Sequence, residues 1–460
     1  MHVESVLLYV LGVLVIVVGL AVSIGLHEIG HLLPAKLFGV RVTQYMIGFG
    51  PTIFSRKRGE TEYGVKAVPL GGYIAMSGMY PPKRPGGAPR EASTGFLQAL
   101  SGDDRAERRP GGIASMIEEA REASAETIVR GEEHRTFYQL PVWKRIVIMV
   151  GGPAMNLVLG FLFTAIVLTG FGVAQPGLTV SSVSECVVPA GSAQTECAAG
   201  DPIAPGAEAG VLPGDEIVGI DGQDAANWDQ VSGIIRDAPG RTFTLEVLRD
   251  GEPVSLQVTP LLTERAVYDD DGRPVLDDAG DPVTAEVGFV GVSPQYETVH
   301  QSITEVPAAV GDNIGRVVHL ILNLPQRLVD VAQAAFGGGE RDPNGPMSVV
   351  GVGRFAGEIA SYDALPVADR ISAMLGILGS LNVMLFVFNL VPLMPLDGGH
   401  VAGAVWEAVR RFFAKLFGRS DPGPVDTAKV IPLTFVVVIL LGGMSALLIY
   451  ADIVNPISLF

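Results

Sequence analysis

An uncharged apolar run of 21 residues leads directly into the motif His27-Glu28-Ile29-Gly30-His31, and this junction constrains the fold more than any other feature. The run covers residues 6–26. At about 1.5 Å per residue, a helix of that length crosses the core of a bilayer. The sequence therefore predicts a membrane-spanning helix with two imidazoles and a carboxylate at one end, where such groups are retained mainly for a function.

The spacing of this motif fits a zinc site. On a helix, His27 and His31 lie four residues apart on one face, so both imidazoles can bind one zinc ion. Glu28 points to the side, where it can accept a proton from a water molecule that the metal activates, without being a ligand. The alternatives are a chance match to a short motif and a span with two interfacial histidines. The apolar context favours zinc hydrolase chemistry over both.

Three further runs lack charged residues and are long enough to cross a bilayer: 146–172, 371–391 and 430–450. We therefore expect a multi-pass α-helical membrane protein with about four transmembrane helices. Neither a basic segment before residues 6–26 nor an A-x-A cleavage site is present, so this run is not expected to be removed as a signal peptide.

The net charge of −17 is distributed unevenly. Residues 36–145 hold 17 Lys and Arg against 12 Asp and Glu, a balance of +5, whereas residues 173–370 hold 10 against 30, a balance of −20. The loop 397–431 holds 5 Lys and Arg against 4 Asp and Glu. By the positive-inside rule, 36–145 and 397–431 are predicted to be cytoplasmic, and the acidic segment and both termini to be outside. The acidic segment also argues against nucleic acid as a partner.

The two cysteines, Cys186 and Cys197, both lie in the segment predicted to be outside. In an oxidising space we expect them to form a disulfide that closes a small loop. The alternative is two free thiols in an insertion rich in Pro, Ala and Gly.

A β-rich domain is predicted outside the membrane. The string from Ala207 to Gly222 resembles the PDZ pattern, in which a glycine turn precedes Gly-Asp-x-Ile and a strand that ends at Asp-Gly. PDZ domains bind peptides by adding a strand to a sheet edge, and a simple hairpin with glycine turns is the alternative. The predicted division is 1–175 for the first part of a membrane metalloprotease core, 176–262 for the PDZ-like domain, 263–365 for a hairpin insertion and a juxtamembrane amphipathic region, and 366–460 for the second part of the core.

Two shorter patterns concern the membrane core. Gly48-Phe49-Gly50-Pro51 predicts a turn, and residues 62–68 and 69–73 predict short strands after it. In the second run, Gly151-Gly152-Pro153-Ala154-Met155-Asn156 combines small residues, which permit close helix packing, with an amide that can hydrogen-bond a neighbouring helix. We assign Asn156 mainly to packing.

A catalytic zinc normally has three protein ligands, so the two histidines require a third. The candidate is Asp397, in the string Asn389-Leu390-Val391-Pro392-Leu393-Met394-Pro395-Leu396-Asp397-Gly398-Gly399-His400, at the predicted cytoplasmic end of the third run. Prolines break the helix there and expose backbone groups that can pair with an extended substrate. His400 is the alternative ligand, and a helix-ending turn is the purely structural interpretation. A carboxylate beside flexible glycines favours Asp397.

The four features together resemble the bacterial site-2 protease family of intramembrane zinc metalloproteases. They are HEIGH in the first span, GPAMN in the second, one PDZ-like insertion and NLVPLMPLDGG in the third span. The single PDZ-like domain and the string GPMSVVGVGR at 345–354 are similar to the actinobacterial regulator-of-sigma-factor type. The resemblance covers most of the chain. Pro34 departs from the commoner form of the first helix, because it frees the Gly30 carbonyl.

The resemblance implies a multi-pass enzyme of the cell membrane that cleaves single-pass membrane proteins, anti-sigma factors in particular, within or near their transmembrane segment. It implies Zn²⁺ bound by His27, His31 and Asp397 near the cytoplasmic side, Glu28 as the catalytic base, and a PDZ-like domain outside that gates access. We expect the unwound substrate to be held as an added strand by a set of four residues. These are Asn389, Pro392, Gly71 and Gly72.

Two other functional classes are possible for such a chain. A transporter or channel can place His, Glu and Asp in its spans as an ion path, but we find no internal repeat in the sequence. A membrane adaptor can use a PDZ-like domain alone, and it has no need for the HEIGH and LDGG motifs together.

Overall fold

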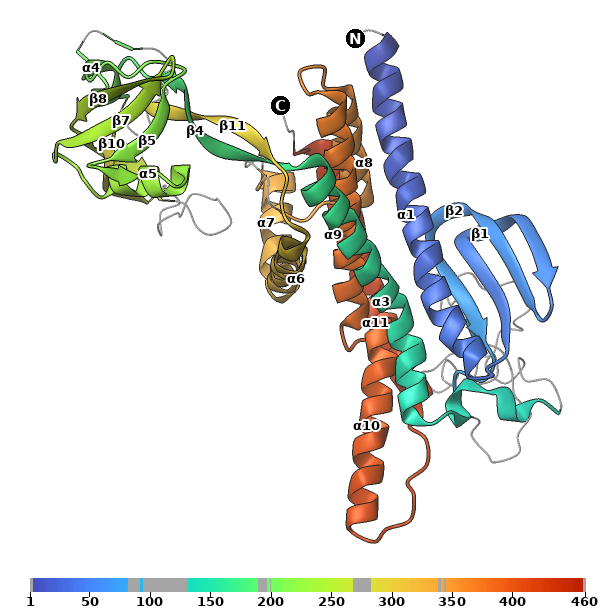
Figure 1. The fold of residues 1–460 in the computed structure, drawn as a ribbon. Helices are drawn as coiled ribbons and strands as arrows, with labels where there is room; N and C mark the ends of the chain where they lie inside the picture. The colour runs from blue at the N-terminus through green and yellow to red at the C-terminus, as the bar shows by residue number, and fades with distance from the viewer. Residues whose placement is uncertain are drawn as a thin grey trace. The chain divides into compact units, whose positions relative to one another are not determined.

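In a computed structural model, the chain is described over residues 3–81, 92–93, 131–188, 197–198, 200–267, 283–337, 341–342 and 345–457. It forms two compact units (Figure 1). The first combines Met1–Phe171 with Ser302–Phe460, and the second is Gly172–Gln301.

Among the described residues of the first unit, four helices are long and apolar enough to span a membrane, as the sequence predicts. They are α1 (Val3–Leu37), α3 (Val142–Ala165, continued by a π-helical stretch Ile166–Phe171), α9 (Val367–Leu390) and α11 (Ile431–Val454). Many large apolar side chains on these helices are exposed, such as Val18 at 58% and Leu440 at 66%. Such faces are stable when lipid surrounds them.

Glycines bring α1 and α3 into close contact. A Cβ on Gly30 would collide with the Gly151 carbonyl, and a Cβ on Gly151 would collide with the Gly30 carbonyl. That carbonyl is the one whose intrahelical donor is replaced by Pro34, and α1 nevertheless continues to Leu37. The predicted close packing of small residues in the second span is therefore confirmed.

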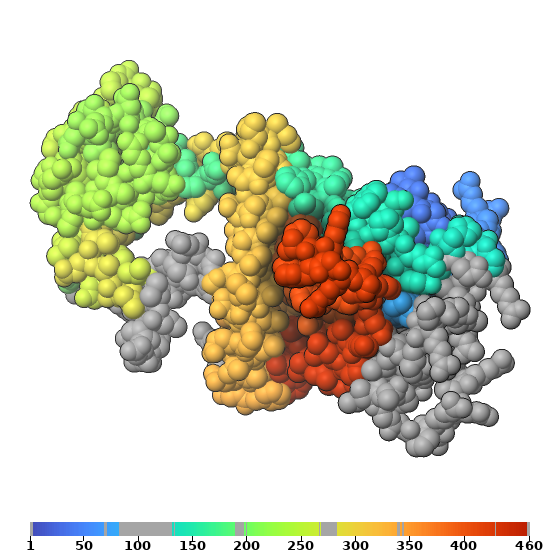
Figure 2. Space-filling model, turned by 90° about the horizontal axis from the view of Figure 1, so that it is seen from below, coloured from blue at the N-terminus to red at the C-terminus, as the bar shows by residue number. Residues whose placement is uncertain are grey.

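Four more α-helices belong to the described residues of the first unit: α6 (Val306–Leu322), α7 (Leu324–Gly337), α8 (Val349–Ser361) and α10 (Asp397–Leu416). The helices α6 and α7, which Asn323 separates, lie in the region 263–365, where a juxtamembrane amphipathic region is predicted. Val331 of α7 packs against Leu448 and Ala451 of α11, and Figure 2 shows the yellow-orange segment of α6 and α7 beside the red C-terminal segment.

The first unit also contains a long hairpin of β1 (Val42–Arg58) and β2 (Thr61–Met76). Residues 44–47 of β1 pair with both halves of β2, since Ile47 is opposite Val65 and Gly72. The turn predicted at Gly48–Pro51 is wrong: these residues remain in β1, where the register shifts. Gly48 and Gly50 take φ values of +90° and +84°, so the glycines make an irregularity within the strand rather than its end.

The second unit is β-rich. Its main sheet has the strand order β11-β4-β5-β7-β8, with β6 paired to β5. The strands are β4 (Val173–Val183), β5 (Glu216–Ile220), β6 (Gln223–Asp224), β7 (Phe243–Arg249), β8 (Glu252–Val258) and β11 (Val292–Val299). The helix α5 (Trp228–Arg236) buries Val231 and Ile235 against core residues of the sheet such as Phe243. A separate antiparallel pair is formed by β9 (Leu261–Ala266) and β10 (Thr284–Phe289), and the predicted hairpin insertion between them lies largely outside the described residues.

Two local features of this unit follow from its sequence. Asp215, from the Gly-Asp pair of the PDZ-like string, is 1% exposed and accepts hydrogen bonds from the Leu212 amide and from Arg249 Nε and Nη2. Cys186 and Cys197 form the predicted disulfide, with their Cα atoms 5.9 Å apart.

Candidate metal centre

Three side chains that are far apart in sequence meet inside the first unit. His27 and His31 come from the last turns of α1, and Asp397 is the first residue of α10. Their ligand atoms all lie within 4.8 Å of one another, and the three residues are 9%, 2% and 9% exposed. The structure thus brings together the two halves of the site that the sequence predicts.

The geometry of these atoms fits zinc. His27 Nε2 and His31 Nε2 are 3.2 Å apart, and Asp397 Oδ2 lies 3.4 Å and 3.3 Å from them. Tetrahedral zinc with bonds near 2 Å requires donor atoms about 3.3 Å apart. Two imidazole nitrogens and one carboxylate oxygen are also donors that catalytic zinc accepts. Among the described residues, this candidate group consists of these three side chains and does not include His400.

The LDGG segment orients Asp397 because its glycines permit a tight connection. The segment between α9 and α10 leaves no room for a Cβ on Gly398, which would collide with the carbonyls of Leu390 and Val391. A Cβ on Gly399 would lie 2.7 Å from the Met394 amide nitrogen. The start of α10 is therefore packed directly on the end of α9, and this contact fixes where Asp397 points.

The helix α3 supports the two histidines from one side. His31 Nδ1 hydrogen-bonds the Ile148 carbonyl at 2.7 Å, and the Asn156 amide contacts His27 Nδ1 at 3.0 Å. Gly152 leaves room for the imidazole, because a Cβ there would collide with His31 Nε2. The hydrogen bond of Asn156 to a neighbouring helix is as the sequence predicts, but its partner and the role of Gly152 are not predictable. The Ile148 carbonyl, a backbone acceptor, carries no residue signature, and a glycine pair indicates only helix packing.

Glu28 lies beside the three candidate ligands and is 6% exposed. Its Oε2 has no hydrogen-bond partner among the described residues. Such a buried oxygen is available to a water molecule at the metal, as the role of general base requires. Gly72 of β2 packs against it, since a Cβ on Gly72 would be 2.9 Å from Glu28 Cγ.

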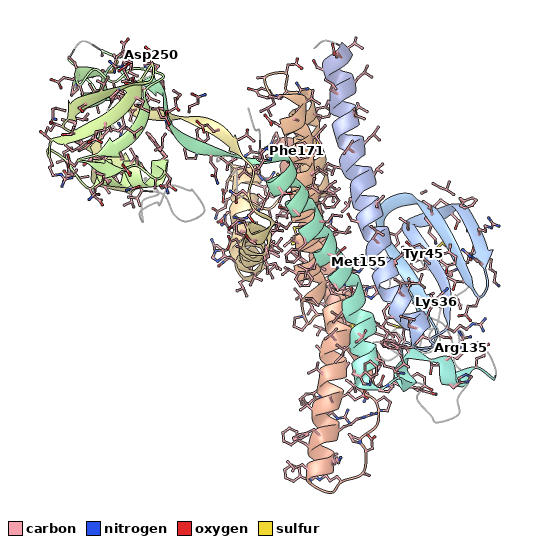
Figure 3. The ribbon with its side chains drawn as sticks, in the orientation of Figure 1. Lys36, Tyr45, Arg135, Met155, Phe171 and Asp250 are labelled. Atoms are coloured by element: carbon pink, nitrogen blue, oxygen red, sulfur yellow. A yellow bond between two sulfur atoms is a disulfide. The ribbon has the colours of Figure 1, made fainter. Side chains whose placement is uncertain are left out.

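The hairpin is attached to α1 close to this carboxylate. The Tyr45 hydroxyl donates a hydrogen bond to the Gly25 carbonyl at 2.8 Å. Burial, followed by the charge of Glu28, raises the pKa of Tyr45 to about 12, so the phenol stays protonated and keeps donating. Figure 3 labels Tyr45 on the sheet beside α1, with Lys36 near the end of that helix.

The four residues predicted to hold substrate lie on two different elements. Gly71 and Gly72 are in β2. They lie just before Ala75, the first residue of β2 that pairs with β3 (Ala92–Ser93). Asn389 is in the last turn of α9, and Pro392 is exposed in the non-helical segment that leads to Asp397. Of these four, the structure places Gly72 directly against Glu28.

On the cytoplasmic side predicted by the charges, a buried ion pair joins α3 to α10. Arg145 Nη2 lies 2.5 Å from Glu407 Oε1, and Glu407 is fully buried. The carboxylate also accepts a hydrogen bond from the Val425 amide at 3.0 Å. This pair holds the helix that carries Asp397 against the helix that supports both histidines.

The chain is similar to known proteases over most of its length. Residues 15–419 match the model of peptidase family M50. The chain is 30% identical to zinc metalloprotease Rip1 of Mycobacterium tuberculosis over 463 residues, covering 99% of this chain and 100% of that protein. It is equally similar to Rip1 of Mycolicibacterium smegmatis, at 30% over 469 residues with the same coverage. Metalloprotease MmpA of Caulobacter vibrioides is 26% identical over 85% of each chain.

Proposed function

The chain belongs to peptidase family M50, and we propose that this zinc metalloprotease cleaves single-pass membrane proteins within or near their transmembrane segment. The observation that carries the proposal is the position of the metal centre. His27 and His31 lie in the candidate span α1, and the third candidate ligand, Asp397, begins α10 shortly after the candidate span α9 ends at Leu390. A peptide substrate must therefore enter between the membrane-spanning helices to reach the site. Family membership argues against the transporter and adaptor classes.

In this proposal His27, His31 and Asp397 hold the zinc ion. When bound, zinc polarises the scissile carbonyl and makes water a stronger nucleophile. Glu28 accepts the proton of the attacking water on Oε2 and later donates it to the leaving amine. The Asn389 amide is assigned to the substrate backbone or to the oxygen that becomes negative in the transition state.

A transmembrane helix hides its peptide bonds in its own hydrogen-bond ladder, so it must be unwound before water can attack. We assign the holding of the unwound substrate to two backbone segments. One is at Gly71 and Gly72, just before the residues of β2 that pair with β3, where Gly72 lies beside Glu28. The other is the segment from Asn389 to Pro392, where α9 ends. A substrate held as an added strand would present its carbonyls to the site in extended form.

The substrate class, topology and gating form a finer part of the proposal. Resemblance to the regulator-of-sigma-factor type supports anti-sigma factors as substrates. The charge distribution supports a site near the cytoplasmic side of the cell membrane, with the acidic segment outside. We assign residues 176–262 to a PDZ-like domain that restricts access of substrates with bulky outside domains.

The test is cleavage of a single-pass substrate by purified protein, with metal content measured on the same samples. Glu28→Gln should keep one zinc and lose cleavage by at least 10²-fold, because an amide cannot accept the proton. His27→Ala should lose both zinc and activity. Cleavage near the wild-type rate by Glu28→Gln would rule out the assigned base, and zinc retention by His27→Ala would rule out the assigned ligands.

A further inference from the structure

Both imidazoles at the metal centre use their second ring nitrogen to contact α3. His31 Nδ1 faces the Ile148 carbonyl at 2.7 Å. A carbonyl oxygen can only accept a hydrogen bond, so His31 Nδ1 carries the proton and the lone pair of Nε2 is free for a metal. Fixing the tautomer of a ligating histidine in this way is typical of metal sites.

The corresponding partner of His27 is the side chain of Asn156. The amide is 0% exposed, and its nitrogen Nδ2 lies 3.0 Å from His27 Nδ1. Its oxygen Oδ1 is buried without a hydrogen-bond partner among the described residues. A buried amide oxygen with no donor is costly, and such a group calls for an explanation.

A half-turn of the amide exchanges Nδ2 and Oδ1 with little change in shape. With Oδ1 toward His27, the Nδ1–H group donates to this oxygen, Nδ2 takes the former position of Oδ1, and the Nε2 lone pair is directed to the metal. With Nδ2 toward His27, the proton of a neutral imidazole must sit on Nε2, which blocks zinc binding. Only the first arrangement is compatible with His27 as a ligand.

We propose that Asn156 is a positioning residue that accepts a hydrogen bond from His27 Nδ1–H and thereby holds Nε2 ready for zinc. The helix α3 then orients both imidazoles, through the Ile148 carbonyl for His31 and the Asn156 side chain for His27. The inference rests on the proposed function, because it assumes that His27 is a zinc ligand. It goes beyond the packing role that the sequence favours for Asn156.

Asn382 provides a matched control for that packing role. It is also 0% exposed, belongs to a different candidate span, and donates from Nδ2 to Ser23 Oγ at 3.0 Å. Ser23 is on α1, one turn before His27, so both asparagines attach a neighbouring helix to nearly the same part of α1. Asn382 makes no contact with a candidate ligand among the hydrogen bonds of the described residues.

The experiment measures zinc affinity of the full-length protein in detergent, by competition with a chelator, with thermal unfolding to verify the fold. Asn156→Ala should weaken zinc binding about 10- to 100-fold, the range typical for loss of such a supporting hydrogen bond. Asn382→Ala should lower the unfolding temperature and leave zinc affinity within about twofold of wild type. Asn156→Asp should bind zinc nearly as well as wild type, because a carboxylate accepts but cannot donate.

Wild-type affinity in Asn156→Ala, or an equal loss in Asn382→Ala, would overturn the proposal. A folded Asn156→Asp protein that binds zinc as poorly as Asn156→Ala would show that the amide must donate, which also overturns it. If Asn156→Asp does not fold, the comparison of the two alanine variants decides. Failure of the proposed function would be seen separately, as unchanged zinc affinity in His27→Ala.

Discussion

Gly152 lies so close to His31 that a Cβ at this position would be 2.2 Å from the imidazole Nε2 and would collide with it. The glycine therefore determines where one of the candidate ligands can stand. Gly152 therefore contributes to the metal centre by the space that it leaves for His31.

We predict that Gly152→Ala displaces His31 and lowers zinc affinity at least tenfold, with a loss of about 1–3 kcal/mol in stability from overpacking. Zinc content and chelator competition measure the effect. Gly376→Ala in α9 is the matched control, since a Cβ there meets no atom within 4 Å. Full zinc affinity in Gly152→Ala would contradict the close packing described here.

The second prediction concerns pH. The hydrogen bonds from Arg249 lower the pKa of Asp215, and the Leu212 amide adds to the effect. A carboxyl whose pKa is lower in the folded state stabilises that state above its unfolded value of about 3.9, and the contribution is lost as the pH falls through the folded value. The protection of the β5 and β7 amides against hydrogen exchange, taken relative to their intrinsic exchange rates at each pH, should therefore decrease below about pH 4.

The control for this pH effect is a pair of variants. In Asp215→Asn the same amides should be less protected at neutral pH, and the acid-dependent loss of protection should be reduced. Asp224→Asn, on the exposed strand β6, should behave as wild type. An unchanged acid profile in Asp215→Asn would show that the ion pair does not stabilise the second unit.

The third prediction is that the Cys186–Cys197 disulfide is present in protein taken from membranes. Denatured, unreduced protein should bind no thiol reagent, and reduction should expose two thiols. By the loop-closure argument, Cys186→Ser with Cys197→Ser should destabilise the second unit by about 2–3 kcal/mol. Two reactive thiols before reduction would contradict the disulfide and weaken the assignment of this segment to the outside.

The fourth prediction tests gating. Val173 of β4 pairs with Val299 of β11, so the chain enters and leaves the second unit at adjacent points. Replacing residues 174–298 by a short Gly-Ser linker should leave zinc binding intact and allow cleavage of substrates whose outside domain has not been trimmed. Glu28→Gln in the deleted protein should abolish that cleavage. A deleted protein that binds zinc but cuts neither trimmed nor untrimmed substrate would show that the domain is needed for docking instead.

Much of this architecture could be predicted because it depends on local patterns. Charge-free runs predicted all four candidate spans, and the four-residue spacing of His27 and His31 predicted a shared face. Asp397 could be paired with them because charge predicted the same membrane depth for both motifs. The double pairing of β1 could not be predicted, because Gly48 and Gly50 are as typical of a turn as of an irregular strand. The ion pair between Arg145 and Glu407 could not be predicted either, because no sequence pattern near one residue indicates a partner that is distant in the chain.

The last candidate span carries a charge that constrains how the protein can assemble. Asp452, near the end of α11, is 5% exposed and is paired with Arg341, and it also accepts hydrogen bonds from the amide and hydroxyl of Ser348. Without these partners a buried carboxylate is costly in a membrane. Arg341 is synthesised long before α11, so Asp452 finds its partner only if Arg341 is already in place when α11 inserts. Chains truncated before Asp452 should leave the charge of Arg341 uncompensated and be targets for quality-control proteolysis.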